Sequence, residues 1–161
     1  MTRPFFDFAI DSWLNLFLSA APALFNIAIF IYVLFFVKRS SLSDVFLFFL
    51  FTLIMWRFQE VVLQICVSQE SAEDWYRMFA FSTNFIGATG LHFVLLLTHG
   101  ERWKLRNPYI FILYFPTFLF SMFFLCNMDY MRFERTENWG WVYTPIHPGS
   151  IAGFVLIGLQ A

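Results

Sequence analysis

Charged and amide side chains interrupt a stretch of the chain that is otherwise apolar. Arg57 and Glu60 are three residues apart and Gln64 follows four residues later, so all three share one face of a helix. Charges inside an apolar segment are costly, and they usually face the interior of a helix bundle or a water-filled cavity. The group is therefore either a structural ion pair that holds helices together or a site that senses a ligand or an ion.

The composition indicates that the solvent of this chain is lipid. Of its 161 residues, 60% are hydrophobic and 13% are charged, and 25 are Phe. An ordinary globular chain is about 45–50% apolar and about 25% charged. The excess of apolar side chains predicts a membrane protein whose partner is the lipid bilayer.

Five apolar segments are candidates for membrane helices, each judged against the roughly 20 residues that a crossing needs. They run over residues 13–37, 45–67, 78–98, 109–126 and 150–161. The fifth is too short to cross, so we expect the helix to continue beyond Ala161. The prediction is an all-α, polytopic membrane helix bundle in which residues 1–161 form one incomplete domain.

The charges of the connecting segments predict the orientation. Basic residues dominate the turns 38–44 and 99–108, whereas acidic residues dominate 68–77 and 127–149. Short segments rich in Lys and Arg stay in the cytoplasm. We therefore expect a multi-pass protein of the plasma membrane with an extracytoplasmic N-terminus.

Asn84, in the third apolar segment, has about the same expected depth in the membrane as Glu60 in the second. With a rise of 1.5 Å per residue, Glu60 and Asn84 are both about 9–11 Å from the outer membrane boundary. We therefore predict an outer pocket lined by Arg57, Glu60 and Asn84, which receives a small molecule or a membrane signal. His92 lies two turns after Asn84 and is more typical of a packing residue than of a metal ligand or a proton relay.

Aromatic residues alternate in the last outer segment. Trp139, Trp141 and Tyr143 would share one face of an extended strand. They either anchor the chain at the depth of the lipid headgroups or form a lid over the outer pocket.

The sequence lacks the residue patterns that several classes of function require. The net charge is −1 and the basic residues are not clustered on one face, so no nucleic-acid partner is expected. Cys66 and Cys126 lack metal-ligand spacing, and whether they form a bridge stays open. The sequence contains no nucleotide-binding glycine loop, zinc pattern or nucleophile–base pair. We predict no cofactor, metal or catalytic residue in this segment, so any chemistry lies beyond Ala161.

The chain resembles the N-terminal seven-helix sensor region of bacterial membrane histidine kinases, which also occurs ahead of cyclases and phosphatases. The resemblance is carried by Trp56 with Glu60, residues 72–77, Leu91-His92-Phe93, residues 96–99, Tyr114-Phe115-Pro116 and residues 139–143. It implies a transmembrane sensory input module of a two-component system, which relays a signal to a cytoplasmic output domain. A homodimer is expected by analogy with kinases. The resemblance supplies no ligand and gives neither His92 nor His99 a catalytic role.

The main alternative is a fragment of a membrane transporter or channel. Transporters tend to contain internal repeats and helices interrupted by Gly or Pro near the membrane midplane. The five segments contain no repeat, which favours the sensor. A membrane enzyme acting on lipid would gather its polar residues at one interface, whereas those of this chain are scattered in depth.

Overall fold

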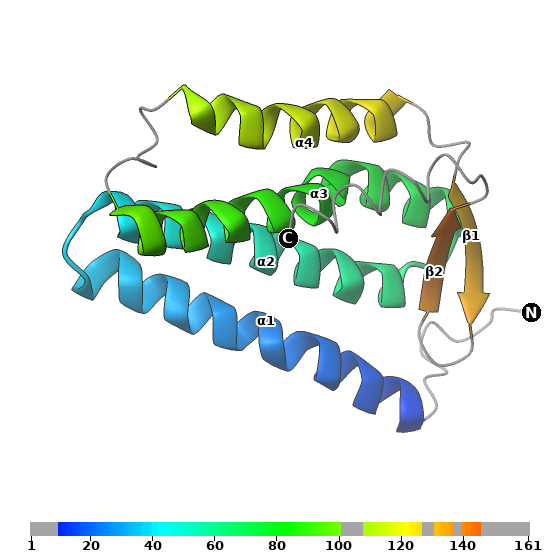
Figure 1. Cartoon of the computed structure of the whole chain (residues 1–161). Helices are drawn as coiled ribbons and strands as arrows, with labels where there is room; N and C mark the ends of the chain where they lie inside the picture. Colours follow the sequence, from blue (N-terminus) through cyan, green and yellow to red (C-terminus); the bar gives the residue numbers. More distant parts are fainter. Residues whose placement is uncertain (1–9, 101–107, 127–130, 137–139, 146–161) are drawn as a thin grey trace, which may run out of the picture.

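Four helices and a two-stranded antiparallel sheet make up the described chain. The computed structural model describes residues 10–100, 108–126, 131–136 and 140–145. The elements are α1 (Ile10–Phe36), α2 (Ser41–Ile65), α3 (Gln69–His99), α4 (Tyr109–Cys126), β1 (Met131–Thr136) and β2 (Gly140–Pro145) (Figure 1). The predicted helical architecture is confirmed, but five helices are not supported. Segment 150–161 lies outside the described residues, and the expected loop 127–149 contains a β-hairpin, so the all-α prediction needs correction.

Helices α1, α2 and α3 are long and apolar enough to cross a membrane, and α4 is a shorter apolar helix. The outer sides of α1 and α4 expose large apolar side chains to an extent that water would not favour. They include Phe17, Phe25, Tyr32, Phe35, Phe36, Phe111, Ile112 and Phe118. This surface fits lipid, so the fold indicates a membrane-embedded protein.

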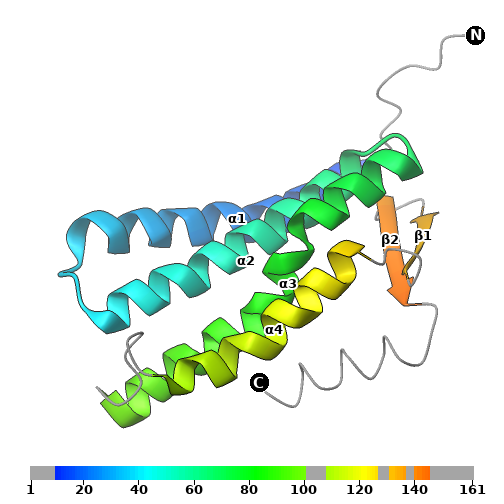
Figure 2. The same cartoon turned by 90° about the horizontal axis from the view of Figure 1, so that it is seen from above.

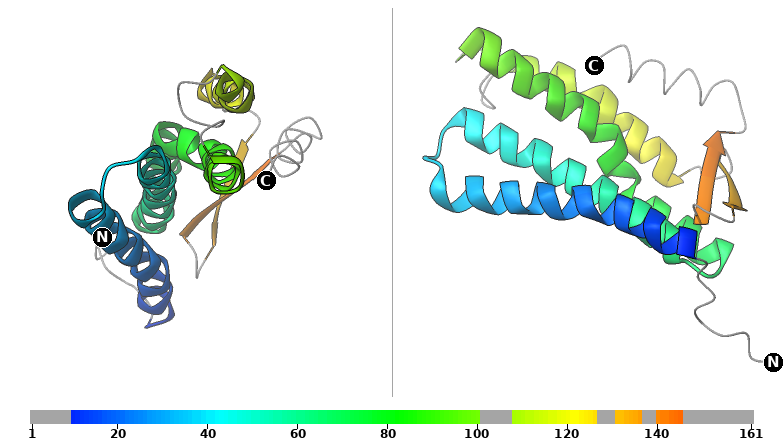
Figure 3. Two further views of the ribbon diagram at one scale, coloured as in Figure 1. Left: turned by 60° about the vertical axis from the view of Figure 1, so that its left-hand side comes forward. Right: turned by 90° about the horizontal axis from the view of Figure 1, so that it is seen from below.

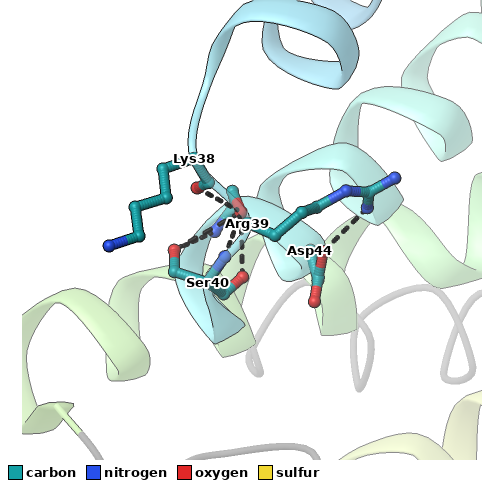
Figure 4. Close-up of polar contacts among 5 residues, drawn as sticks. Lys38, Arg39, Ser40 and Asp44 are labelled. Atoms are coloured by element: carbon teal, nitrogen blue, oxygen red, sulfur yellow. Dashed lines mark hydrogen bonds and ion pairs between the residues drawn. The ribbon is translucent and has the colours of Figure 1, made fainter.

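Helix α2 begins earlier than predicted, because residues of the preceding turn cap its first turn. The Ser40 hydroxyl accepts a hydrogen bond from the Ser43 backbone N–H at 3.1 Å, and the Ser43 hydroxyl accepts one from the Ser40 N–H at 2.8 Å. Arg39 pairs with Asp44 at 2.9 Å beside this capping box (Figure 4). The reciprocal cap satisfies N–H groups that a helix start leaves unpaired, so α2 begins at Ser41 rather than at residue 45.

The predicted acidic loop 68–77 is wrong, because α3 begins at Gln69. The Ser68 hydroxyl accepts a hydrogen bond from the Ser71 N–H at 3.2 Å and caps the helix. Glu70 lies in the first turn, where a negative charge stabilises the helix dipole. With 31 residues, α3 is about 46 Å long, so it exceeds an apolar layer of about 30 Å.

The helices pack as neighbours in sequence order (Figure 3). Polar contacts join each pair. The Gln64 amide donates to the Ser19 hydroxyl at 2.7 Å between α2 and α1, and the Thr52 and Thr89 hydroxyls lie 3.2 Å apart between α2 and α3. Between α3 and α4, Asn84 donates to Ser121 at 3.3 Å, and His92 Nδ1 lies 2.9 Å from the Tyr114 hydroxyl. Such contacts help to hold membrane helices together, because moving an apolar side chain from lipid into the bundle gives little hydrophobic gain.

The hairpin lies against the end of the bundle where α2 ends and α3 begins (Figure 2). Its register pairs Phe133 with Tyr143, and the side chains of Met131 and Phe133 are buried. One apolar cluster joins it to both helices, comprising Val62, Leu63, Cys66, Ala72, Tyr76, Ala80, Met131 and Phe133, with Trp75, Phe120, Trp141 and Tyr143 packed around them. The hairpin is therefore a packed part of the fold.

Candidate functional site

Two contacts fix the beginning of β2 to the end of α2. Gly140 has φ +67°, and a Cβ atom there would lie 2.5 Å from Cα of Gln64 and 2.9 Å from the carbonyl oxygen of Leu63. Only glycine allows so close an approach with this backbone conformation. The next residue, Trp141, donates its indole N–H to the Cys66 carbonyl at 3.0 Å. These contacts set the position of the following β2 residues over α2.

A pocket of about 370 Å³ lies between α1, α2 and β2. Its lining combines one ion pair, two aromatic side chains, a hydrogen-bonded Ser–Gln pair and apolar walls: Leu18, Ser19, Arg57, Glu60, Leu63, Gln64, Trp141, Val142 and Tyr143. Figure 1 shows α1 diverging from α2 toward this end, with β2 beside them. A volume at the small end of the range for ligand pockets, with few polar groups among apolar walls, is typical of a small-molecule site.

Arg57 and Glu60 form the charged part of this pocket. Their Nη1 and Oε2 atoms are 2.7 Å apart, and their side chains are 31% and 29% exposed. The guanidinium carbon also lies 4.3 Å from the centroid of the Trp56 ring, a cation–π distance. An arginine has five N–H donors, and within the described chain only the Glu60 contact uses one. Within that part of the chain, the other donors remain for a ligand.

Tyr143 brings the hairpin to the charged pair. Its ring centroid lies 4.3 Å from that of Tyr76 in α3, which holds the side chain in place. Burial raises the pKa of the Tyr143 phenol, and the nearby Glu60 carboxylate raises it further. The phenol therefore stays protonated at neutral pH and keeps a hydrogen-bond donor beside the carboxylate.

The structure brings together some of the predicted site residues. Arg57 and Glu60 line one pocket with the predicted lid residues Trp141 and Tyr143, whereas Trp139 lies outside the described residues. Asn84 is not among the lining residues. Its side chain is buried and donates to Ser121 of α4. Figure 3 shows α4 on the side of α3 away from α1.

Sequence reasoning did not assign Ser19 or Val142 to the site. Ser19 is a single hydroxyl in an apolar segment, and its bond to Gln64 depends on the crossing of α1 and α2. The position of Gln64, one turn after Glu60, was the available signal for this wall of the pocket.

The remaining candidate residues are His92 and the two cysteines. His92 is fully buried and contacts the Tyr114 hydroxyl, as expected of a packing residue. Cys66 is buried, Cys126 is exposed, and both are free thiols. Among the described residues, no group of His, Cys, Asp or Glu is arranged to hold a metal ion.

Comparison of the chain with protein-family models, curated proteins and solved structures found no match. The resemblance to kinase sensor regions therefore stays a prediction, and the pocket is the main structural basis for a function.

Proposed function

We propose that this chain is the transmembrane input module of a signal-transduction protein, and that the pocket between α1, α2 and β2 receives the signal. The observation that carries the proposal is the ion pair of Arg57 and Glu60, which lies in a pocket with apolar walls that β2 lines on one side. Charges within an apolar membrane segment are costly and are typical of functional sites. A pocket of this kind is suited to a ligand smaller than about 370 Å³.

Binding in this pocket has a direct route to the helices. A ligand would contact α1 through Leu18 and Ser19, α2 through Arg57 and Glu60, and the hairpin through Tyr143. A ligand transmits a signal only when it binds two arrangements of the protein with different affinities. Drawing α1 toward α2, or the hairpin toward both, would create such a difference, because the pocket is formed by all three elements.

The proposed topology places the pocket near the extracytoplasmic side of the plasma membrane. The N-terminus is outside and the output domain lies in the cytoplasm beyond Ala161. By its resemblance to kinase sensor regions, the whole protein is a dimeric sensor histidine kinase. In this proposal the kinase chemistry belongs to the output domain, and the present segment supplies the ligand-dependent change of structure.

The transporter alternative has less support from the bundle. Its buried polar contacts, such as Thr52 with Thr89, join side chains of neighbouring helices and account for their burial by packing. Among the described residues, Gln59 Oε1 and Thr83 Oγ1 are the buried side-chain atoms without a hydrogen-bond partner. Two separate atoms do not make a continuous polar path.

The test is Glu60→Gln in the full-length protein, with autophosphorylation measured in native membranes. The substitution removes the ion pair but keeps the shape of the side chain. Loss of a charged hydrogen bond costs about 1.5–3 kcal/mol, so we expect the phosphorylation level to change by roughly tenfold or more. Arg132→Gln is the matched control, because Arg132 pairs with Glu134 on the exposed face of the hairpin. Equal phosphorylation of the Glu60→Gln and unsubstituted proteins, both inserted normally, would exclude the pocket as the input site.

A further inference from the structure

We propose that the pocket recognises a zwitterionic group, with an anionic part bound by Arg57 and an ammonium part bound near Glu60, Trp141 and Tyr143. This inference names the ligand class of the proposed input site, so it rests on the function proposed above. The anionic part is a carboxylate or a phosphodiester. The ammonium part is a primary or substituted amine.

The charge balance of the pocket is the first support. Arg57 and Glu60 neutralise each other at 2.7 Å, so the lining carries both signs and no net charge. A simple anion would be attracted by Arg57 and repelled by Glu60. A simple cation would be attracted by Glu60 and repelled by Arg57. A zwitterion aligned against the pair gains at both ends and brings no net charge among the apolar walls.

The aromatic lining is the second support. Trp and Tyr rings attract ammonium groups through their negative faces. The indole N–H of Trp141 is already bound to the Cys66 carbonyl, so Trp141 offers a ligand chiefly its ring. Tyr143 adds a second ring and a neutral phenol beside Glu60. Both rings line the same pocket as the Glu60 carboxylate, which favours a cation, and the Tyr143 phenol lies near that carboxylate.

The size and position of the pocket limit the source of the ligand. About 370 Å³ accommodates an amino acid or one lipid headgroup with the start of its chain. Leu18 lines the pocket and is also half-exposed on the apolar surface of α1, so the pocket adjoins the surface that faces lipid. The zwitterion thus comes from a free amino acid or from the headgroup of a membrane lipid.

The experiment compares zwitterions with singly charged analogues of the same shape. The chain is held in uncharged maltoside micelles and tryptophan fluorescence is titrated with leucine, leucinamide or 4-methylpentanoate. In a second arm, phosphatidylethanolamine or anionic phosphatidylglycerol is added to the micelles. We expect one zwitterion to bind saturably and at least tenfold more tightly than its charged analogues. Saturable binding of leucine assigns a free ligand, and binding of phosphatidylethanolamine alone assigns a lipid.

Variants tie the binding to the pocket. Arg57→Gln and Glu60→Gln should each weaken zwitterion binding at least tenfold, and Arg132→Gln should leave it unchanged. If the single variants fail to fold, the double variant Arg57→Glu with Glu60→Arg keeps the ion pair and should keep the preference for a zwitterion. Tighter binding of either charged analogue, or equal binding by the Gln variants, would overturn the ligand class. If Glu60→Gln still changes phosphorylation while no zwitterion binds, the input-site proposal stands and only the ligand class fails.

Discussion

Gly140→Ala tests whether the hairpin depends on its contact with α2. The wild-type residue has φ +67°, where an L side chain costs about 1–3 kcal/mol. The added Cβ would also lie 2.5 Å from Cα of Gln64, so the two backbones must separate. Relieving such an overlap typically costs about 1–3 kcal/mol. We therefore expect a loss of about 3 kcal/mol in the free energy of unfolding.

Gly100→Ala is the matched control. Gly100 has φ +60°, but a Cβ atom there would meet nothing within 4 Å. Its ψ is −132°, outside the left-handed helical region, so the substitution carries a backbone cost alone, of about 1–3 kcal/mol. A larger loss for Gly140→Ala than for Gly100→Ala, together with easier cleavage of the hairpin, is the expected sign of the steric contact with Leu63 and Gln64.

The assay is unfolding in mixed micelles, followed by tryptophan fluorescence, with limited proteolysis of the hairpin as a second measurement. In the Gly140→Ala variant, separation of β2 from α2 should also weaken the bond from Trp141 to Cys66 and make the hairpin easier to cleave. Equal losses of stability for Gly140→Ala and Gly100→Ala, with unchanged cleavage, would refute the close packing of β2 on α2.

Three further predictions concern the same framework. Thr52→Val removes the hydroxyl contact with Thr89 while keeping the side-chain shape, and should lower the free energy of unfolding by about 0.6 kcal/mol in mixed micelles; an unchanged value would contradict the proposed adhesion of α2 to α3. Ser40→Ala removes the cap of α2 and should lower the free energy of unfolding by about 1 kcal/mol, measured in the same way. A decrease of less than a few tenths of a kcal/mol would contradict the role of this cap. Tyr143 has a raised pKa in the folded chain, so the unfolded state loses its phenol proton first and stability should fall as pH rises above the ordinary value of 10.0. Tyr143→Phe should make that fall less steep, and an identical pH profile would argue against burial of the phenol.

The sequence allowed the prediction of contacts that depend on helical spacing. Arg57 and Glu60 meet because they are three residues apart on one helix. The membrane character of the chain followed from its composition, because side chains facing lipid need no special pattern.

Contacts that depend on direction around a helix were not predictable in this way. Asn84 and Glu60 have similar expected depths, but Asn84 faces Ser121 of α4 and is absent from the pocket lining. The expected depth of a residue in the membrane follows from its number alone. Which neighbouring helix its side chain faces depends on how α3 is rotated about its axis. One sequence does not fix that rotation.

The hairpin and the start of α3 were missed for local reasons. The acidic residues 70–74 resembled a solvated loop, but the Ser68 cap allows them to continue as helix. Trp141 and Tyr143 alternate as in a strand, but no partner strand was predicted for them. In the partner β1, Met131 and Phe133 alternate with polar residues over only a short segment. Packing against α2 and α3 then stabilises a hairpin that would be marginal alone.

The most direct test of the proposed input module is to determine the reading frame of the source gene beyond codon 161. The proposal predicts that the frame completes a seven-helix membrane domain and continues into a cytoplasmic output domain, with a histidine-containing dimerisation helix and an ATP-binding domain for a kinase. A cyclase or phosphatase there would keep the input role with another output. A frame that adds only membrane helices and then stops would contradict the signalling account, and Arg57 and Glu60 would then be tested as part of a transport path.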